Sequence, residues 1–156
     1  MVQAYNFLAS WQLFPEKGTY EYGERPKSGI YKIEAVPGTK ELLIYHNWVS
    51  LENQAFAASY KVIANGDLND FENHDLADKV QAVIPDGINF EIHFYNKGEI
   101  SLHVVHEIMP NGYLKITQQG VKEDGKAYTN TEIYHKQLSV LPYSASVSGA
   151  VIKATE

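Results

Sequence analysis

Turn-forming dipeptides recur along this chain at intervals that leave room for strands and for little else. Asn-Gly and Asp-Gly favour the positive backbone φ of tight hairpin turns. From Asp86 onward the turns are 11 to 14 residues apart, which is the spacing of a β-meander. The dipeptides that separate apolar or alternating runs are Pro37-Gly38, Asn65-Gly66, Asp86-Gly87, Lys97-Gly98, Asn111-Gly112 and Asp124-Gly125.

The runs between these turns are rich in Val, Ile, Tyr, Phe and Thr, residues that suit a pleated, half-buried surface. They predict strands at Phe7–Phe14, Gly29–Val36, Leu42–Val49, Ala55–Ala64, Lys79–Ile84, Ile88–Tyr95, Glu99–Ile108, Tyr113–Gln119 and Ala127–Lys136. A further short strand is expected at Thr19–Tyr22 and a short helical turn at Val2–Ala9. Asp67–Asp78 is acidic with few apolar anchors, and we predict a long loop there with one helical turn at most.

We therefore predict an all-β fold, a single antiparallel up-and-down β-barrel of about 9–10 strands. A meander with one apolar face can pack as a sandwich or close on itself, and closure also removes exposed sheet edges. Closure is favoured because few helices are available to cover a sheet. Residues 1–156 are assigned to one domain, in which 137–156 form a C-terminal tail or an extra strand.

The composition narrows the possible functions. The net charge of −6 leaves no large basic surface, so neither nucleic acid nor an anionic membrane is an expected partner. The chain has no cysteine, which excludes disulfides and cysteine-based metal sites or nucleophiles. No apolar run approaches the ~20 residues that span a bilayer, and Met1–Ser10 lacks the pattern of a secretory signal. A cytoplasmic protein is expected.

Alternation between Ile88 and Ile116 also predicts the register of three strands. A slip by one residue would set apolar against polar positions, so one pairing is favoured. The expected opposite pairs are Phe94 with Ile100, Ile92 with Leu102, Phe90 with Val104, Ile108 with Leu114, and His106 with Ile116. The apolar face that results provides candidates for the wall of a ligand cavity, namely Phe90, Ile92, Leu102 and Val104.

His106 interrupts this apolar face between Val104 and Ile108. If the face lines a cavity, an imidazole there is the kind of isolated polar group that orients a ligand. The alternative, which the sequence favours, is a core histidine that is hydrogen-bonded to a neighbour.

Three polar side chains, Glu91, His93 and His103, are predicted to gather on the other face, with Glu91 opposite His103. Imidazole and carboxylate groups suit zinc or iron(II). None of the histidines has the helical spacing of a known zinc motif, so a solvated patch is the favoured interpretation and no metal site is predicted.

The chain has 11 tyrosines, most of them in or beside the predicted strands. Tyrosine offers apolar area together with a hydroxyl, which suits both a barrel wall and a pocket. Tyr31, Tyr45 and Tyr60 lie on three successive strands, and a subset of them is expected to line one side of a cavity. Trp48 is expected at the rim or in the pocket.

Two segments resemble the calycin superfamily, which comprises lipocalins, fatty-acid-binding proteins and related bacterial barrels. The opening Phe7-Leu8-Ala9-Ser10-Trp11-Gln12-Leu13 is similar to the family's Phe-Leu-Gly-x-Trp-x-Leu, with Ala9 in place of glycine. Leu114–Gly120 followed by Thr129–Lys136 resembles the closing hairpin of fatty-acid-binding proteins. The resemblance spans residues 7 to 136 and implies a lipocalin-like barrel with Trp11 packed at the closed end.

The chain departs from fatty-acid-binding proteins in two respects. Those proteins insert two lid helices between their first two strands, whereas Pro15–Ser28 is short and broken by proline and glycine. Their last strand carries Arg-x-Tyr to bind a carboxylate. Aligned on Tyr134, the arginine position is Glu132, and Arg25 in the first loop is the only arginine. Fatty acids bound in that way are therefore not expected.

We expect a non-enzymatic protein that binds or transports a small, mostly apolar molecule in the barrel lumen. His106, Tyr134 and Glu132 are the expected orienting groups. The first loop, Gly18–Ser28, and the acidic loop, Asp67–Asp78, are the candidates for covering the open end. No catalytic residue and no cofactor are predicted, because the familiar enzyme motifs are missing.

Three alternatives stay open. The nitrobindin-like branch of the calycins holds haem through a histidine near its C-terminus, a resemblance that would give His135 this role. A cofactor-free isomerase or cyclase on the same barrel would need an acid or base in the lumen, for which His106 is the strongest candidate. A packed barrel would instead act through its surface or as a homodimer built by the tail.

Overall fold

The computed structural model describes residues 2–137. Each predicted strand is present, with ends that differ from the prediction by a few residues. The elements are the 3-10 helices η1 (Val2–Phe7) and η2 (Pro15–Lys17) and the strands β1 (Ala9–Leu13), β2 (Thr19–Tyr20), β3 (Ser28–Ala35), β4 (Glu41–Val49), β5 (Ala55–Ile63), β6 (Leu68–Asp70), β7 (Lys79–Asp86), β8 (Asn89–Asn96), β9 (Glu99–Ile108), β10 (Leu114–Val121) and β11 (Ala127–Lys136).

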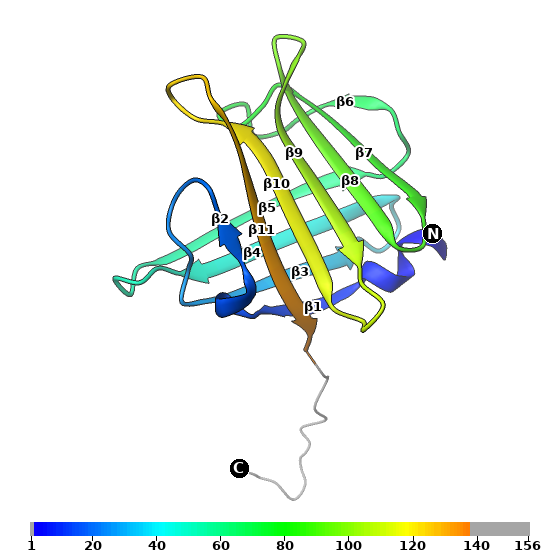
Figure 1. Cartoon of the computed structure of the whole chain (residues 1–156). Coiled ribbons are helices and arrows are strands. Elements are labelled where there is room, and N and C mark those ends of the chain that lie inside the picture. The colour runs from blue at the N-terminus through cyan, green and yellow to red at the C-terminus, as the bar shows by residue number, and fades with distance from the viewer. Residues whose placement is uncertain (1, 138–156) are drawn as a thin grey trace, which may run out of the picture.

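These strands form one antiparallel sheet in the order β5-β4-β3-β1-β11-β10-β9-β8-β7-β6, and β2 pairs with β11 off this path. Most neighbours in the sheet also follow one another in sequence, whereas the β1–β11 pair joins the first strand to the last. The sheet curls strongly into a half-barrel, so that β3, β4 and β5 cross β8, β9 and β10 (Figure 1). The predicted all-β, antiparallel up-and-down fold is confirmed.

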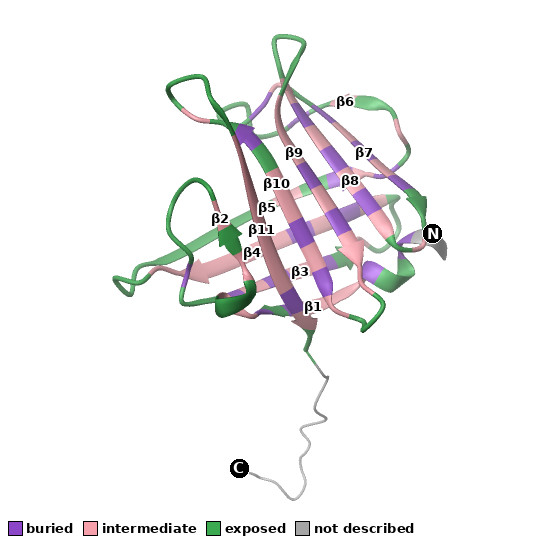
Figure 2. Ribbon diagram, viewed as in Figure 1, coloured by how far each residue is buried: buried purple, intermediate pink, exposed green. Residues whose placement is uncertain are grey.

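The concave face is filled by side chains in the closed half of the barrel. Buried positions alternate with more exposed ones along β8, β9 and β10 (Figure 2). Trp11 is buried and its indole Nε1 donates a hydrogen bond to the carbonyl of Phe7 at 3.1 Å. The largest fully buried side chains are Trp11, Tyr134, Phe7, Phe71, Phe90, Phe94, Ile33, Ile44, Ile92, Leu114, Ile116 and His106.

An aromatic cluster bridges the two edges of the sheet, β5 and β6, which no backbone ladder joins within residues 2–137. Phe71 follows β6 and is buried, and its ring centroid lies 5.7 Å from that of Tyr60 on β5 and 5.2 Å from that of Phe94 on β8. The segment Asp67–Asp78 contains a short strand and hydrogen-bonded turns, one of them a single helical turn in which the Ala77 amide donates to the Asn73 carbonyl at 3.2 Å. Its role in the fold is to insert Phe71 and Ala77 into the core.

The predicted register between β8 and β9 is wrong by two residues. The observed opposite pairs are Phe90 with His106, Ile92 with Val104, and Phe94 with Leu102. One residue of the shift comes from the turn, where Asn96 pairs with Glu99, and the second comes from a β-bulge in β9. Tyr95 therefore pairs with Ile100, and Ile100 is 50% exposed instead of lying in the core. The same shift places His103 opposite His93 and not opposite Glu91. Between β9 and β10, the predicted pairs of Ile108 with Leu114 and His106 with Ile116 are confirmed.

Two further observations concern the ends of the chain and the helices. Most of the predicted tail or extra strand at 137–156 lies outside the described residues. Among residues 2–137, neither helix has the length and apolar character needed to cross a membrane.

Ile92 and Ile100 provide a matched test of the register, because they lie on adjacent strands and differ in burial. Ile92→Ala leaves a cavity in the packed core and should lower the free energy of unfolding by about 2–5 kcal/mol. Ile100→Ala removes exposed atoms and should lower it by less than about 1 kcal/mol. Urea unfolding followed by circular dichroism measures both changes, and losses of equal size would contradict the observed register.

Candidate functional site

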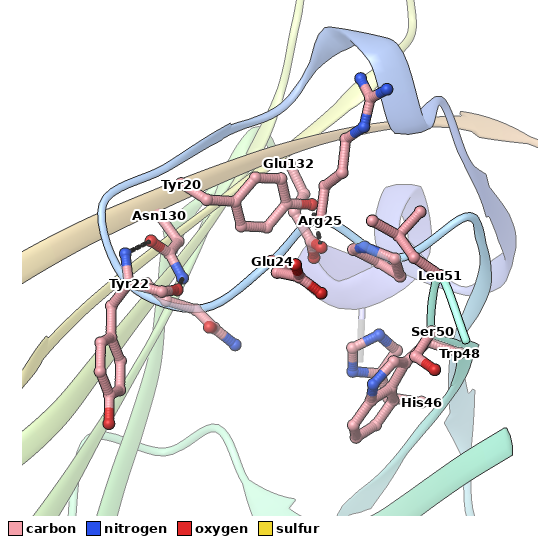
Figure 3. A pocket seen from close by; sticks show the side chains of 12 residues that line it. Tyr20, Tyr22, Glu24, Arg25, His46, Trp48, Ser50, Leu51, Asn130 and Glu132 are labelled. Atoms are coloured by element: carbon pink, nitrogen blue, oxygen red, sulfur yellow. Dashed lines mark hydrogen bonds between the residues drawn. The ribbon is translucent and has the colours of Figure 1, made fainter. Parts of the chain in front are cut away.

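The open half of the barrel contains a cavity of about 270 Å³ (Figure 3). Three regions build its wall: the first loop with β2, the end of β4 with the turn that follows, and the inner faces of β10 and β11. The residues that line it are Tyr20, Tyr22, Glu24, Arg25, Pro26, His46, Trp48, Ser50, Leu51, Gln118, Asn130 and Glu132.

The inner face changes from apolar to polar partway along the strands, and the cavity begins there. On β10, Ile116 is buried in the core, and the next inward position, Gln118, lines the cavity. On β4, Ile44 is likewise followed by His46. Because side chains two apart in a strand share a face, this change in residue type divides the barrel into a packed half and a hollow half.

Glu132 accepts two tyrosine hydrogen bonds beside the cavity. The Tyr20 hydroxyl donates to Oε2 at 2.6 Å, and the Tyr134 hydroxyl donates to Oε1 at 2.7 Å. No lysine or arginine among residues 2–137 forms an ion pair with this carboxylate. Arg25 lies at the rim, and Figure 3 shows its guanidinium pointing away from Glu132. Glu132 is therefore an acceptor whose partners are neutral groups.

The titratable neighbours of Glu132 are held in their neutral forms. Burial, together with the nearby carboxylate, raises the pKa of the Tyr20 and Tyr134 hydroxyls, so both remain donors. Burial lowers the pKa of His46, although Glu132 opposes this shift. The Tyr134 hydroxyl and His46 Nε2 are 3.5 Å apart. At neutral pH the base of the cavity thus combines a carboxylate, two phenols and a neutral imidazole.

An aromatic wall stands beside this polar base. The Trp48 ring stacks on Phe56, with centroids 5.4 Å apart and planes inclined by 17°. The ring of His46 also contacts Trp48, with the two ring centroids 4.6 Å apart. Trp48 is half-buried, so one part of the indole is held by these contacts and another part lines the cavity.

The first loop is fixed over the cavity by Asn130 of β11. Its Oδ1 accepts hydrogen bonds from the backbone amides of Glu21 and Tyr22 at 2.8 and 3.2 Å. Its Nδ2 donates to the Tyr22 carbonyl at 2.9 Å. The expectation that the first loop covers the open end agrees with this placement, whereas no residue of the acidic loop, Asp67–Asp78, lines the cavity.

His106 does not line the cavity and is fully buried in the packed half. Its Nδ1 lies 2.9 Å from the Phe90 carbonyl, to which it donates, and its Nε2 accepts from the Tyr31 hydroxyl at 2.8 Å. Burial lowers the pKa of this imidazole to about 4. His106 is therefore a core histidine bonded to its neighbours, as the sequence favoured.

The other predicted site residues fall into two groups. Glu132 and Trp48 line the cavity, and Tyr134 is buried next to it through its bond to Glu132. The remainder lie elsewhere: Tyr31, Phe90, Ile92 and Val104 are buried in the packed half, Tyr60 and Leu102 pack against that core, and Tyr45 lies on the outer face, with Lys32 Nζ 5.8 Å from its ring centroid.

His135 also points away from the lumen. Alternation along β11 buries Tyr134 inside, so the next residue faces outward. The His135 ring packs against Phe14 with centroids 4.5 Å apart. This imidazole is therefore not directed toward the cavity.

Several cavity residues were not predicted from the sequence. Gln118 lies on the same strand face as Ile116, and Asn130 on the same face as Glu132. Alternation along the strands could therefore have predicted that both side chains point inward. His46 shares its face with Trp48 in the same way. Tyr20 and Arg25 come from the first loop, which was expected to cover the open end, but no sequence pattern indicates which of its side chains face the cavity.

No family model and no curated protein matches the chain. The resemblance to calycins therefore stays a prediction.

The burial of His106 predicts how stability depends on pH. The pKa of His106 is about 4 in the folded protein against an ordinary value of 6.5. As the pH falls, the imidazole therefore becomes protonated in the unfolded chain before it does so in the folded protein. The free energy of unfolding should fall as the pH drops from about 6.5 to about 4, with about 3 kcal/mol due to His106. His46, whose pKa is also lowered, adds to the fall in the same direction.

Urea unfolding between pH 7.5 and 4.5 measures this dependence. His106→Gln should lose most of the slope, and His46→Gln should keep the larger part of it. The same slope in His106→Gln as in the unmodified protein would contradict the assignment.

Proposed function

We propose that this protein binds a small molecule non-covalently in the cavity at the open end of the barrel, as a carrier or sensor. The observation that carries the proposal is Glu132, a carboxylate beside the cavity, held by two tyrosine hydroxyls and next to an aromatic wall. A concave site in which convergent polar groups stand beside aromatic side chains is a typical candidate for binding a small molecule.

The volume of the cavity limits the size of the ligand. At about 270 Å³ it is close to the lower end of the range for small-molecule pockets, roughly 300–1,000 Å³. The cavity does not continue along the barrel axis into the packed half, where the buried side chains of Phe90, Ile92 and Ile116 lie. A compact molecule fits this space better than a fatty acid does.

The chemistry of the wall favours a ligand with one cationic group. A protonated amine would donate a charge-assisted hydrogen bond to Glu132, and Glu24 adds a second acidic side chain to a lining whose one lysine or arginine among residues 2–137 is Arg25. The face of Trp48 suits a planar apolar body or the cation itself. The net charge of −6 also attracts cations. We therefore refine the expected ligand from mostly apolar to an apolar body that carries one amine.

The enzymatic alternatives receive no comparable support. The cofactor-free reaction depended on His106, whose two ring nitrogens are both occupied in the packed half. The haem hypothesis depended on His135, whose ring packs against Phe14 on the outer face. We do not propose either activity.

Phenethylamine and its neutral counterpart 2-phenylethanol test the role of the carboxylate. The amine should bind more tightly than the alcohol, and Glu132→Gln should weaken amine binding by roughly 10–100-fold, because a charged hydrogen bond is lost. The same variant should change binding of the alcohol by roughly twofold or less. Calorimetric titration measures the affinities, and quenching of Trp48 fluorescence places the ligand in the cavity.

Glu34→Gln is the matched control, since Glu34 is exposed on β3 and pairs with Lys32 outside the cavity. Equal affinity for amine and alcohol, or an amine affinity that Glu132→Gln leaves unchanged, would refute the proposed ligand chemistry. Native mass spectrometry of the freshly purified protein complements the titrations, because a mass that leaves on denaturation identifies the resident ligand.

A further inference from the structure

A second cluster of polar side chains lies on the outer face of the barrel, away from the cavity. It consists of Glu91 and His93 on β8 and His103 on β9, two strands that lie side by side (Figure 1). All three side chains are partly exposed, with 33% of the Glu91 side chain and 24% of the His103 side chain accessible to solvent. None of them lines the cavity at the open end.

The register of the sheet brings these three side chains together. His93 and His103 are directly opposite, and their rings stack with centroids 4.0 Å apart and planes inclined by 15°. Glu91 is two residues before His93 on the same face, and its Oε1 lies 3.1 Å from His103 Nε2. One nitrogen or oxygen atom from each residue lies within 4.8 Å of the other two.

One nitrogen of the cluster makes no hydrogen bond to any other described residue. His93 Nδ1 is shielded from solvent and has no hydrogen-bond partner among residues 2–137. Gln81, which lies opposite His93 on β7, is already engaged, because its amide donates to the Gly66 carbonyl and accepts from the Tyr95 hydroxyl. A shielded nitrogen without a partner costs free energy unless something binds it.

We propose that Glu91, His93 and His103 bind one zinc ion on the outer face of β8 and β9, with water completing the coordination. Zinc takes nitrogen and oxygen ligands at about 2.0–2.2 Å, which places tetrahedral ligand atoms roughly 3.3 Å apart. The three ligand atoms already lie within 4.8 Å of one another, and the backbone ladder fixes the two strands, so only small side-chain movements separate this arrangement from a zinc site. Calcium and magnesium prefer oxygen ligands alone, so two imidazoles select against them.

Such an ion would link β8 to β9 near the middle of both strands. The ion would take the place of the hydrogen bond between His103 Nε2 and Glu91 Oε1 and would give His93 Nδ1 a partner. The proposal is independent of ligand binding in the cavity, because the two sites share no residue.

Titration of the full-length, tag-free, chelator-treated protein with Zn²⁺ tests the proposal. Calorimetry should give one ion per chain, and the midpoint of thermal unfolding should rise with Zn²⁺ concentration. His93→Ala and His103→Ala should each weaken binding roughly tenfold or more, and Glu91→Gln should weaken it as well. Co²⁺ should give visible absorption bands that Zn²⁺ removes, while excess Mg²⁺ should not compete.

His74→Ala is the matched control, because His74 is an exposed histidine in the loop before β7. It should bind Zn²⁺ as the unmodified protein does. Circular dichroism of each variant without metal shows whether the fold is kept, and Glu91→Gln retains the size of the side chain. No binding at millimolar Zn²⁺, or binding that survives His93→Ala and His103→Ala but is lost in Glu132→Gln, would overturn the proposal.

Discussion

Burial of one apolar sheet face is the constraint on which the rest of this structure depends. The chain offers no long helix within residues 2–137 to cover that face, so the sheet must cover itself by curling. The curl brings β4 and β5 against β8 and β9, and it leaves two sheet edges that do not meet in a backbone ladder. Phe71 fills the space between those edges, which explains why a polar, acidic loop carries one fully buried ring.

The cavity forms in one half of the barrel because the side chains of the other half already make a closed, packed core. The hydrogen-bonded chain from Tyr31 through His106 to the Phe90 carbonyl satisfies the polar groups of the core. Beyond it, the inner positions of β10 and β11 carry amides and a carboxylate, side chains that do not fill space as aromatic rings do. Glu132 lies at the boundary between the packed half and the hollow half. Tyr134 on its core side is fully buried, and Tyr20 on its other side belongs to the first loop.

The strands could be predicted from the sequence because Gly-containing turns and β-branched runs are local signals. The register of β8 and β9 could not, because the bulge before Leu102 adds a residue that alternation alone does not reveal. Pattern reasoning placed Tyr45 with Tyr31 although the two strands set them on opposite faces. Trp48 was expected from its place beside His46 on the strand, and Glu132 from the alignment with the closing hairpin of fatty-acid-binding proteins. No sequence pattern indicates which side chains of the first loop, such as Tyr20, face the cavity.

The edge strand β5 has a consequence for how fast the backbone amides of the sheet exchange with solvent. Within residues 2–137 it pairs only with β4, and from Ala55 to Ser59 its side chains are exposed on both faces. Alternate amides of this stretch therefore have solvent as their partner, and Phe56 ties the stretch to the Trp48 wall. Fraying of so short a segment requires far less free energy than unfolding the core. Solvent deuterium would then reach the amides of this edge long before those of β8.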